Sequence, residues 1–300
     1  MNLNIKIGNK TFKNPVFTAS GTSGYGEEYN NLFDLNILGA FITKGITITK
    51  RDGNDGLRIF ETPSGIINRI GLQNVGINEF IKEKLPFLIN KNVSIIVNIA
   101  GFSIEEFIKM IEILDSIKEI KAIEINVSCP NVKKGGIFFS SDKTLFTKLL
   151  KNIRKKTNKL LIIKLSPSEG NLKEFAKIVE VEGGDAVTIS NTFKAAVVDT
   201  KLKTIKIKGG LSGAAIYPIV LNNIIELYKF IDIPIIASGG IYNPNIALQF
   251  LLAGAKAVEI GSAAFKNPFI FIKTIEYIKN YLIDNKISDI NDLIGAVHNE

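Results

Sequence analysis

The stretch Ala122-Ile-Glu-Ile-Asn-Val-Ser-Cys-Pro-Asn131 decides how the rest of the chain is interpreted. Its first half is an isoleucine-rich apolar run, which is typical of a buried strand. The strand must end at Pro130, because proline has no N–H to give to a sheet. Cys129, the single cysteine of the 300 residues, therefore lies where a strand runs into a loop, between Asn126 and Asn131. If the strand belongs to a barrel, this is the end at which chemistry takes place.

Outward from this stretch, about eight apolar strands alternate with about eight helices. A short hairpin is expected over residues 3–12, followed by strands over residues 15–20, 40–45, 94–100, 122–127, 160–165, 186–192, 234–240 and 257–262. Helices are expected over residues 27–38, 78–88, 103–114, 142–155, 172–181, 209–231 and 244–253, and from residue 268 onward. The strands are continuous apolar runs, as expected where both faces of a parallel sheet are buried.

This order and length predict a single domain over residues 1–300 with an α/β fold of the (β/α)₈ TIM-barrel type, for which ~250 residues is typical. The glycine-rich segment over residues 47–76 predicts short β segments inserted over the C-terminal mouth of the barrel. A doubly wound open sheet is the competing architecture. It is disfavoured because no G-x-G-x-x-G follows the first strand, and because polar residues end nearly every strand instead of gathering at one crevice.

The composition excludes several kinds of site. One cysteine rules out a disulfide within the chain and an all-cysteine metal site. The one histidine, His298, lies near the end of the chain, which argues against a Ser-His-Asp triad and against a zinc site with two histidines. No metal is expected, and a general base must be Cys, Lys, Asp, Glu or Tyr. The chain has no apolar run of ~18 residues and no secretory signal, so we expect a cytoplasmic protein that does not enter a membrane.

The formal net charge of +8 raises nucleic acid as a possible partner. The lysines are interleaved with glutamates along the expected helices, and the densest basic cluster, residues 151–156, is typical of a solvated helix face. No aromatic-rich RNA-binding pattern accompanies it. We therefore expect no nucleic-acid partner, and a nucleic-acid-binding barrel is kept only as an alternative.

Polar residues and glycines gather at the strand ends, where the active sites of barrels lie. Asn98, Asn126 and Asn191 lie at three of these ends, and because an amide both donates and accepts, together they suit a neutral polar ring. The alternative is that each asparagine satisfies its own loop backbone. The whole set comprises Ser20, Lys44, Asn98, Asn126, Cys129, Lys164, Asn191, Thr192, Gly239, Gly240, Gly261 and Ser262.

Lys44 and Lys164 lie within otherwise apolar strands, where an unpaired charge is costly. The functional interpretation is a fixed positive charge that holds an anionic group and stabilises developing negative charge. The alternative is a structural ion pair with Glu124 or Asp185. The glycines that end the seventh and eighth strands suit a phosphate held by backbone N–H groups, although glycine also simply ends strands.

Cys129 is the candidate base. Without a histidine or an evident carboxylate partner, a thiol base needs a sequestered site in which nearby positive charge favours the thiolate. The alternative is a small buried hydrophobic residue, which is common for a free cysteine.

Three segments resemble the signatures of class 1 dihydroorotate dehydrogenases, which are FMN-dependent (β/α)₈ barrels of pyrimidine biosynthesis. The segments are Asn126-Val-Ser-Cys-Pro-Asn131, Asn68-Arg-Ile-Gly-Leu-Gln-Asn74 and Gly209-Gly-Leu-Ser-Gly213. The resemblance runs over essentially the whole chain. The Gly-Leu-Ser-Gly form and Asn131-Val-Lys-Lys-Gly-Gly136 are similar to class 1B, the catalytic subunit of the NAD-linked enzyme.

The resemblance implies a role for each matching position. Cys129 would be the base. One FMN would be bound by Ser20, Lys44, Gly45, Asn98, Asn126, Lys164, Ser190 and Gly213, with its phosphate on Gly239, Gly240, Gly261 and Ser262. The substrate would be bound by Lys44, Asn68, Arg69, Ile70, Gly71, Leu72, Asn126, Asn131, Asn191 and Thr192.

The chemistry implied by the resemblance is the oxidation of (S)-dihydroorotate to orotate. Cys129 would remove the C5 proton while hydride leaves C6 for the flavin. Class 1B implies a partner subunit that carries FAD and a [2Fe–2S] cluster and passes electrons to NAD, in a heterotetramer of two catalytic and two electron-transfer chains. The alternatives are a class 1A-type homodimer that reduces fumarate and a barrel isomerase or synthase that binds phosphate without flavin.

The chain also departs from the family pattern. Arg69 stands where a small residue is usual, and Ser190 replaces an aliphatic residue before Asn191-Thr192. Ala214 stands where proline is common, and the segment over residues 193–209 is a few residues shorter than usual. None of these departures touches Cys129 or the asparagines.

Overall fold

The computed structural model describes residues 1–127, 139, 141–166 and 171–299, and its centre is a ring of eight parallel strands. The sheet order is β3-β14-β13-β10-β9-β8-β7-β4, which is chain order around the ring. The ring closes where Phe17 bridges Ala40 and the Thr18 amide donates to the Ala40 carbonyl at 3.3 Å. The predicted (β/α)₈ barrel is confirmed. Its strands are β3 (Val16–Thr18), β4 (Phe41–Ile42), β7 (Ile95–Ile99), β8 (Ile120–Asn126), β9 (Leu160–Leu165), β10 (Ala186–Ile189), β13 (Ile235–Ser238) and β14 (Ala255–Ile260).

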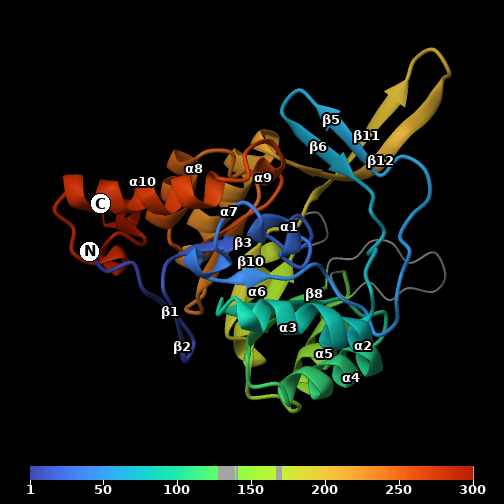
Figure 1. The fold of residues 1–300 in the computed structure, drawn as a ribbon, viewed down its shortest axis with the longest axis horizontal. Helices are drawn as coiled ribbons and strands as arrows, with labels where there is room; N and C mark the ends of the chain where they lie inside the picture. The colour runs from blue at the N-terminus through green and yellow to red at the C-terminus, as the bar shows by residue number, and fades with distance from the viewer. Residues whose placement is uncertain (128–138, 140, 167–170, 300) are drawn as a thin grey trace.

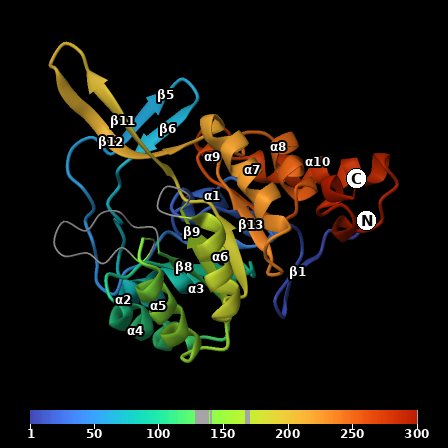
Figure 2. The same cartoon turned by 180° about the vertical axis from the view of Figure 1, so that it is seen from behind.

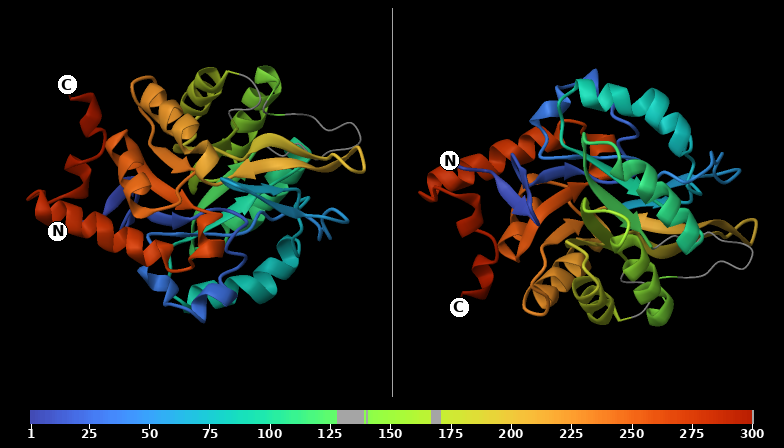
Figure 3. Two further views of the ribbon diagram at one scale, coloured as in Figure 1. Left: turned by 90° about the horizontal axis from the view of Figure 1, so that it is seen from above. Right: turned by 90° about the horizontal axis from the view of Figure 1, so that it is seen from below.

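Helices pack around the outside of this ring, as the two views along the vertical axis show (Figure 3). Helix α4 is typical: Ser103 accepts a hydrogen bond from the Glu106 amide and caps its N-terminus. Its apolar side chains recur at helical spacing and are buried against the barrel. The helices are α1 (Glu27–Asn30), α2 (Ile77–Glu79), α3 (Leu85–Asn90), α4 (Ile104–Asp115), α5 (Lys143–Arg154), α6 (Leu172–Val181), α7 (Tyr217–Tyr228), α8 (Pro244–Leu252), α9 (Ala263–Lys266) and α10 (Ile270–Asp284).

A second, four-stranded antiparallel sheet projects from the barrel (Figures 1 and 2). Its order is β11-β12-β6-β5, formed by β5 (Ile59–Thr62), β6 (Gly65–Asn68), β11 (Phe193–Asp199) and β12 (Thr204–Ser212). Because these strands follow the C-terminal ends of β4 and β10, the sheet lies on the side of the C-terminal mouth. The predicted inserted β segments over residues 47–76 are confirmed. A hairpin of β1 (Ile5–Ile7) and β2 (Lys10–Phe12) precedes the barrel, as predicted.

Three predicted helices differ from the observed ones. The helix expected over residues 27–38 is divided into α1 and a 3₁₀ turn (Leu35–Ile37), because the Asp34 side chain accepts from the Asn36 amide at 2.9 Å and starts a new turn. The helix over residues 78–88 includes a π-helical turn (Phe80–Lys84). The third, expected to open at Gly209, is α7, which begins at Tyr217 after a 3₁₀ turn (Ala214–Ile216), because residues 209–212 belong to β12.

A row of buried polar side chains crosses the interior of the barrel. Six strands, β7, β8, β9, β10, β13 and β14, each contribute one of them, and hydrogen bonds connect the six. They are Asn98, Glu124, Lys164, Thr188, Ser238 and Glu259. Apolar side chains fill the layer between the strands and the outer helices. This polar layer is the floor on which the residues of the C-terminal mouth rest.

Candidate active site

Two of the predicted asparagines meet at the C-terminal mouth. Asn126 ends β8, and Asn191 follows β10 by two residues. The Asn191 side-chain amide donates to Asn126 Oδ1 at 3.2 Å, and its backbone amide donates to the Leu165 carbonyl at 3.0 Å. In the β8–β9 register Asn126 is paired with Lys164. The structure thus places Asn126, Lys164 and Asn191 side by side at the ends of three consecutive barrel strands.

The projecting sheet is joined to this mouth through Thr192. Asn68, the last residue of β6, donates its side-chain amide to the Gly210 carbonyl at 3.1 Å. A Cβ on Gly210 would lie 2.0 Å from Thr192 Oγ1, so only glycine lets β12 pass so close to this hydroxyl. Asn68 and Thr192, both predicted to bind the substrate, therefore lie on either side of Gly210.

The run from residue 68 to residue 72 leads from the sheet back to the barrel. Leu72 has a left-handed backbone, φ +56°, and its carbonyl accepts from the Asn74 side chain at 2.7 Å. The Asn54 side chain donates to the Arg69 carbonyl, and the Asn54 amide donates to the Ile70 carbonyl. These contacts hold the backbone of the run in place.

Gly45 brings the second loop of the mouth against β7. A Cβ on Gly45 would lie 2.9 Å from Asn98 Oδ1 and 3.6 Å from Leu72 Cδ2. The preceding Lys44 is half-buried, and burial, followed by the positive charge of Arg58, lowers the pKa of its ammonium group. Gly45, Asn98 and Leu72 are thus neighbours, with Lys44 at the edge of the same loop.

Lys164 lies in the buried polar layer with two carboxyl groups. Its Nζ is 2.6 Å from Glu259 Oε2 and 3.7 Å from Glu124 Oε1. Burial opposes the charge on Lys164, but the Glu124 and Glu259 carboxylates outweigh it and raise the pKa of the ammonium group. The alternative of an ion pair with Glu124 is therefore confirmed for Lys164, with Glu259 as a second partner. Asp185 pairs instead with Arg154, at 2.9 Å.

The glycines predicted to hold a phosphate form two groups. Gly239 and Gly240 have positive φ angles of 120° and 78°, and a Cβ on Gly240 would lie 2.4 Å from the Cα of Tyr217, where α7 begins. Ile216 connects Gly239 to the turn after Gly213. The second group lies between β14 and β3, where a Cβ on Gly261 would lie 3.2 Å from that of Ala19. Ser20 and Ser262 directly follow Ala19 and Gly261 in the loops after β3 and β14.

The residues present fit an FMN molecule at this mouth. Asn98 Oδ1 is buried and has no hydrogen-bond partner among the described residues, so it can accept from a ligand N–H group. Gly239 and Gly240 have positive φ angles and lie against the N-terminus of α7, and a helix N-terminus suits a phosphate. The buried layer below supplies the Lys164 ammonium group. An acceptor, a phosphate cradle and a cation are the donor and acceptor types that an isoalloxazine ring with a phosphate tail requires.

Two of the predicted site residues, Cys129 and Asn131, lie outside the residues that the structure describes. Ser190 is described, and its hydroxyl donates to the Asn191 carbonyl at 2.9 Å. Its side chain therefore has a local partner at the position where the family has an aliphatic residue.

Sequence reasoning missed several members of the site. Glu259 and Thr188 were not identified, although a glutamate within the apolar run Ala257-Val-Glu-Ile260 carries the same signal that identified Lys164. Arg58, which lowers the pKa of Lys44, lies in the inserted segment and had no distinctive pattern. Ser238, 3.4 Å from Lys164 Nζ, precedes the predicted glycine pair directly.

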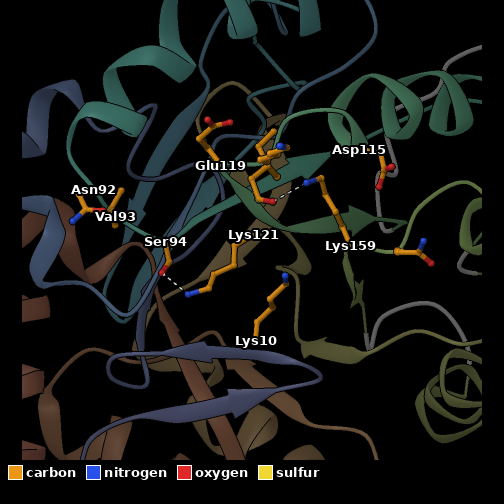
Figure 4. Close-up of a pocket in the computed structure, with 11 residues that line it drawn as sticks. Lys10, Asn92, Val93, Ser94, Asp115, Glu119, Lys121 and Lys159 are labelled. Carbon is orange, nitrogen blue, oxygen red and sulfur yellow. Dashed lines mark hydrogen bonds between the residues drawn. The ribbon is translucent and has the colours of Figure 1, made fainter.

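A separate cavity of about 520 Å³ lies at the opposite end of the barrel (Figure 4). It is lined by residues at the N-terminal ends of β7, β8 and β9. Its Lys159 ammonium donates to the carbonyls of Ile117 and Ile120, and that of Lys121 donates to Ser94 Oγ at 3.1 Å. These lysines fasten strand ends together, so the cavity is not the site built by the predicted residues. In the described part of the chain no helix is both long and apolar enough to cross a bilayer.

Comparison with known proteins gives a consistent result. The family model described as dihydroorotate dehydrogenase matches residues 2–282. A protein of Thermoanaerobacter pseudethanolicus named dihydroorotate dehydrogenase B (NAD(+)), catalytic subunit, is 47% identical over 300 residues, which are 99% of each chain. One of the same name from Brachyspira hyodysenteriae is 48% identical over 304 residues. A crystal structure of the Eimeria tenella enzyme, in complex with ferulenol, is 21% identical with a TM-score of 0.83. It covers 100% of this chain and 89% of its own, and it supports the fold.

Proposed function

Because this chain belongs to the dihydroorotate dehydrogenase family, we propose that it oxidises (S)-dihydroorotate to orotate in pyrimidine biosynthesis, as the catalytic subunit of an NAD-linked enzyme. The observation that carries the proposal is the near-complete match, at 47% identity, to a protein that bears this name. The mouth geometry supports it, because the amides of Asn126 and Asn191, which suit a neutral polar ring, meet beside the buried Lys164 ammonium group.

FMN, when bound, supplies a two-electron acceptor for hydride. In this proposal the glycines at the ends of β13 and β14 hold its phosphate, and the orphaned Asn98 Oδ1 accepts from its ring. Lys164 would supply a positive charge beside bound FMN, which would favour the gain of negative charge on reduction. The full binding set is Ser20, Lys44, Gly45, Asn98, Asn126, Lys164, Ser190, Gly213, Gly239, Gly240, Gly261 and Ser262.

The substrate is a ring of alternating N–H and C=O groups with one carboxylate. Asn126 and Asn191 both donate and accept, so they match the ring groups, and the Lys44 ammonium matches the carboxylate. Asn68 and Thr192 approach from the projecting sheet. The remaining proposed contacts come from Arg69, Ile70, Gly71, Leu72 and Asn131.

Cys129 is proposed as the general base, three residues beyond the end of β8 in the sequence. The C5 proton of the substrate passes to its Sγ atom while hydride leaves C6. A thiolate is favoured by nearby positive charge, which Lys44 supplies at the same mouth. Exclusion of water by the projecting sheet keeps the proton on this path.

A second subunit that carries FAD and a [2Fe–2S] cluster is proposed to take the electrons to NAD, in a heterotetramer of two catalytic and two electron-transfer chains. A [2Fe–2S] cluster needs about four cysteine ligands, and this chain has one. Cluster and NAD chemistry therefore fit a separate chain. The homodimer that reduces fumarate is not favoured, because the relatives are named as catalytic subunits of an NAD(+) enzyme.

The test is the choice of electron acceptor. The chain expressed with a candidate electron-transfer subunit should copurify with it and reduce NAD with dihydroorotate. A homodimer that turns over rapidly with fumarate and does not bind such a subunit would contradict the class of enzyme proposed.

A further inference from the structure

Lys164 shares the barrel interior with one more carboxyl group than its charge can balance. Lys164, Glu124 and Glu259 are the charged residues that are buried in the described part of the chain, and the two glutamates have no exposed surface. If all three groups were ionised, the cluster would carry a net charge of −1 in an interior where uncompensated charge is strongly unfavourable.

Strands β7, β10 and β13 each contribute an uncharged polar group that faces the cluster of Lys164, Glu124 and Glu259. β7 contributes Asn98, whose side chain donates to Glu124 Oε1 at 2.6 Å, and β13 contributes the Ser238 hydroxyl, 3.4 Å from Lys164 Nζ. β10 contributes Thr188. Lys44 follows β4 at the mouth and is half-buried, with the charged Arg58 and Glu28 as its neighbours. Among the described residues, the titratable groups that face the two carboxyls inside the barrel are therefore each other and Lys164.

The two contacts of the Thr188 hydroxyl indicate how many protons the two carboxyl groups hold. Thr188 Oγ1 lies 2.9 Å from Glu124 Oε2 and 3.1 Å from Glu259 Oε1. A hydroxyl has one proton to donate, so Thr188 can make both contacts as full hydrogen bonds only if one of the carboxyls donates in return. Burial, followed by the neighbouring Glu124 carboxylate, raises the pKa of Glu259 to about 8. Geometry and pKa agree on one proton held by the pair at neutral pH.

We propose that Glu124 and Glu259 act as positioning residues that share one exchangeable proton and thereby set the charge that Lys164 presents to the FMN. With the proton present the cluster is neutral, and with the proton lost it carries −1 beside the ring. This inference rests on the proposed function, because it needs FMN at Lys164.

The consequence is an extra proton coupled to reduction. Negative charge that builds up against Lys164 increases the proton affinity of the pair, since like charges disfavour ionisation. At neutral pH the pair holds its proton in both redox states. Above pH about 8 the oxidised protein has lost this proton, and the pair takes one back from solvent for every two electrons gained. In this uptake an O–H bond of water breaks and leaves hydroxide in the solvent, and a new O–H bond forms on a carboxylate oxygen.

The first test measures the reduction potential of bound FMN between pH 6 and 9.5. It is carried out in a Cys129→Ser background, so that the thiol cannot titrate in the same range. We expect the potential to fall more steeply above pH about 8, by the equivalent of one further proton per two electrons. Glu259→Gln should abolish the steepening, because glutamine cannot ionise. Glu112→Gln, which removes an exposed partner of Lys156, should retain it. A steepening that persists in Glu259→Gln, or none in the parent protein, would overturn the proposal.

The second test detects the protonated carboxyl group directly in FMN-free protein. Infrared spectra with labelled glutamate should show a protonated carboxyl band at pH 7 that disappears above pH about 8. The band should be absent from Glu259→Gln or Glu124→Gln and present in Glu112→Gln. Absence of the band from the wild type would overturn the shared proton even if no variant folds. Failure of the protein to bind FMN would count against the proposed function, while the infrared result would still decide the proton.

Discussion

Asn191 donates its side-chain amide to Asn126 Oδ1 at 3.2 Å, joining the ends of β10 and β8 across the mouth of the barrel. The two strands are not neighbours, because β9 lies between them. Asn191 Oδ1 also accepts from the Thr192 backbone amide at 2.8 Å. The contact therefore aligns the two amides beside Lys164, and in the proposed function they recognise a ring of alternating N–H and C=O groups.

Replacement of Asn191 by alanine should weaken catalysis without loss of the fold. Loss of one hydrogen-bonding partner at a desolvated site costs about 1–3 kcal/mol, which corresponds to a roughly 10- to 100-fold lower kcat/KM for dihydroorotate. Steady-state kinetics with FMN content measured in parallel checks this. Asn222→Ala, on the exposed face of α7, serves as the control. Equal kcat/KM for Asn191→Ala and wild type would argue against substrate binding by this residue.

Gly240→Ala should damage both the fold and FMN binding. Its Cβ would lie 2.4 Å from the Cα of Tyr217, and φ is +78°. Gly56 has nearly the same φ, +74°, with nothing within 4 Å of the added Cβ. Gly56→Ala should therefore cost only the left-handed strain of about 1–2 kcal/mol, and Gly240→Ala should cost more. Urea unfolding and FMN titration of the two variants compare them, and equal losses would show that the close approach to α7 is unimportant.

Lys164→Met should destabilise the protein strongly. Removing one partner of a buried ion pair typically costs about 3–5 kcal/mol, because the remaining charge is left uncompensated. Lys156→Met removes an exposed pair with Glu112 and should cost about 0–1 kcal/mol. The free energy of unfolding in urea measures both. A Lys164→Met protein as stable as wild type would mean that the buried cluster adjusts without its cation.

Stability should depend on pH through Glu259. Its pKa in the folded protein is about 8, above the ~4.3 of an unfolded glutamate, so the folded state retains a proton that the unfolded chain has lost. Stability from this group is complete below pH ~4.3 and is lost as pH rises to about 8, by up to ~1.4 kcal/mol per pH unit. Relative to Glu259→Gln, the wild type should become progressively less stable from pH 5 to 8 and then level off. Parallel curves for the two proteins would show that the carboxyl is ionised in the fold.

The barrel was predictable because each strand is a continuous apolar run and each break carries glycine, proline or asparagine. The bounds of the helices that follow β3 and β12 were harder to predict. The Asp34 side chain divides the first, and the close passage of Gly209 and Gly210 past Asn68 and Thr192 keeps the second in a strand. Such contacts depend on segments that are distant in sequence.

The site was predictable residue by residue where a polar group ends an apolar strand, as with Asn126, Lys164 and Asn191. The balance of charge among Lys164, Glu124 and Glu259, which lie beneath the site, was not predictable. Glu124 and Glu259 meet through Thr188 only after the ring has closed, and no spacing in the chain indicates that contact.

The most direct test of dihydroorotate oxidation is to mix the purified, FMN-loaded protein with dihydroorotate under anaerobic conditions. The loss of flavin absorbance, recorded in a stopped-flow instrument, measures the rate of FMN reduction. We expect a yellow protein that bleaches rapidly. We also expect a Cys129→Ser variant that keeps its FMN but bleaches at least ~10²-fold more slowly at neutral pH, since serine is a much weaker acid than cysteine. A colourless protein, no bleaching by dihydroorotate, or an unchanged rate in Cys129→Ser would contradict the proposed function.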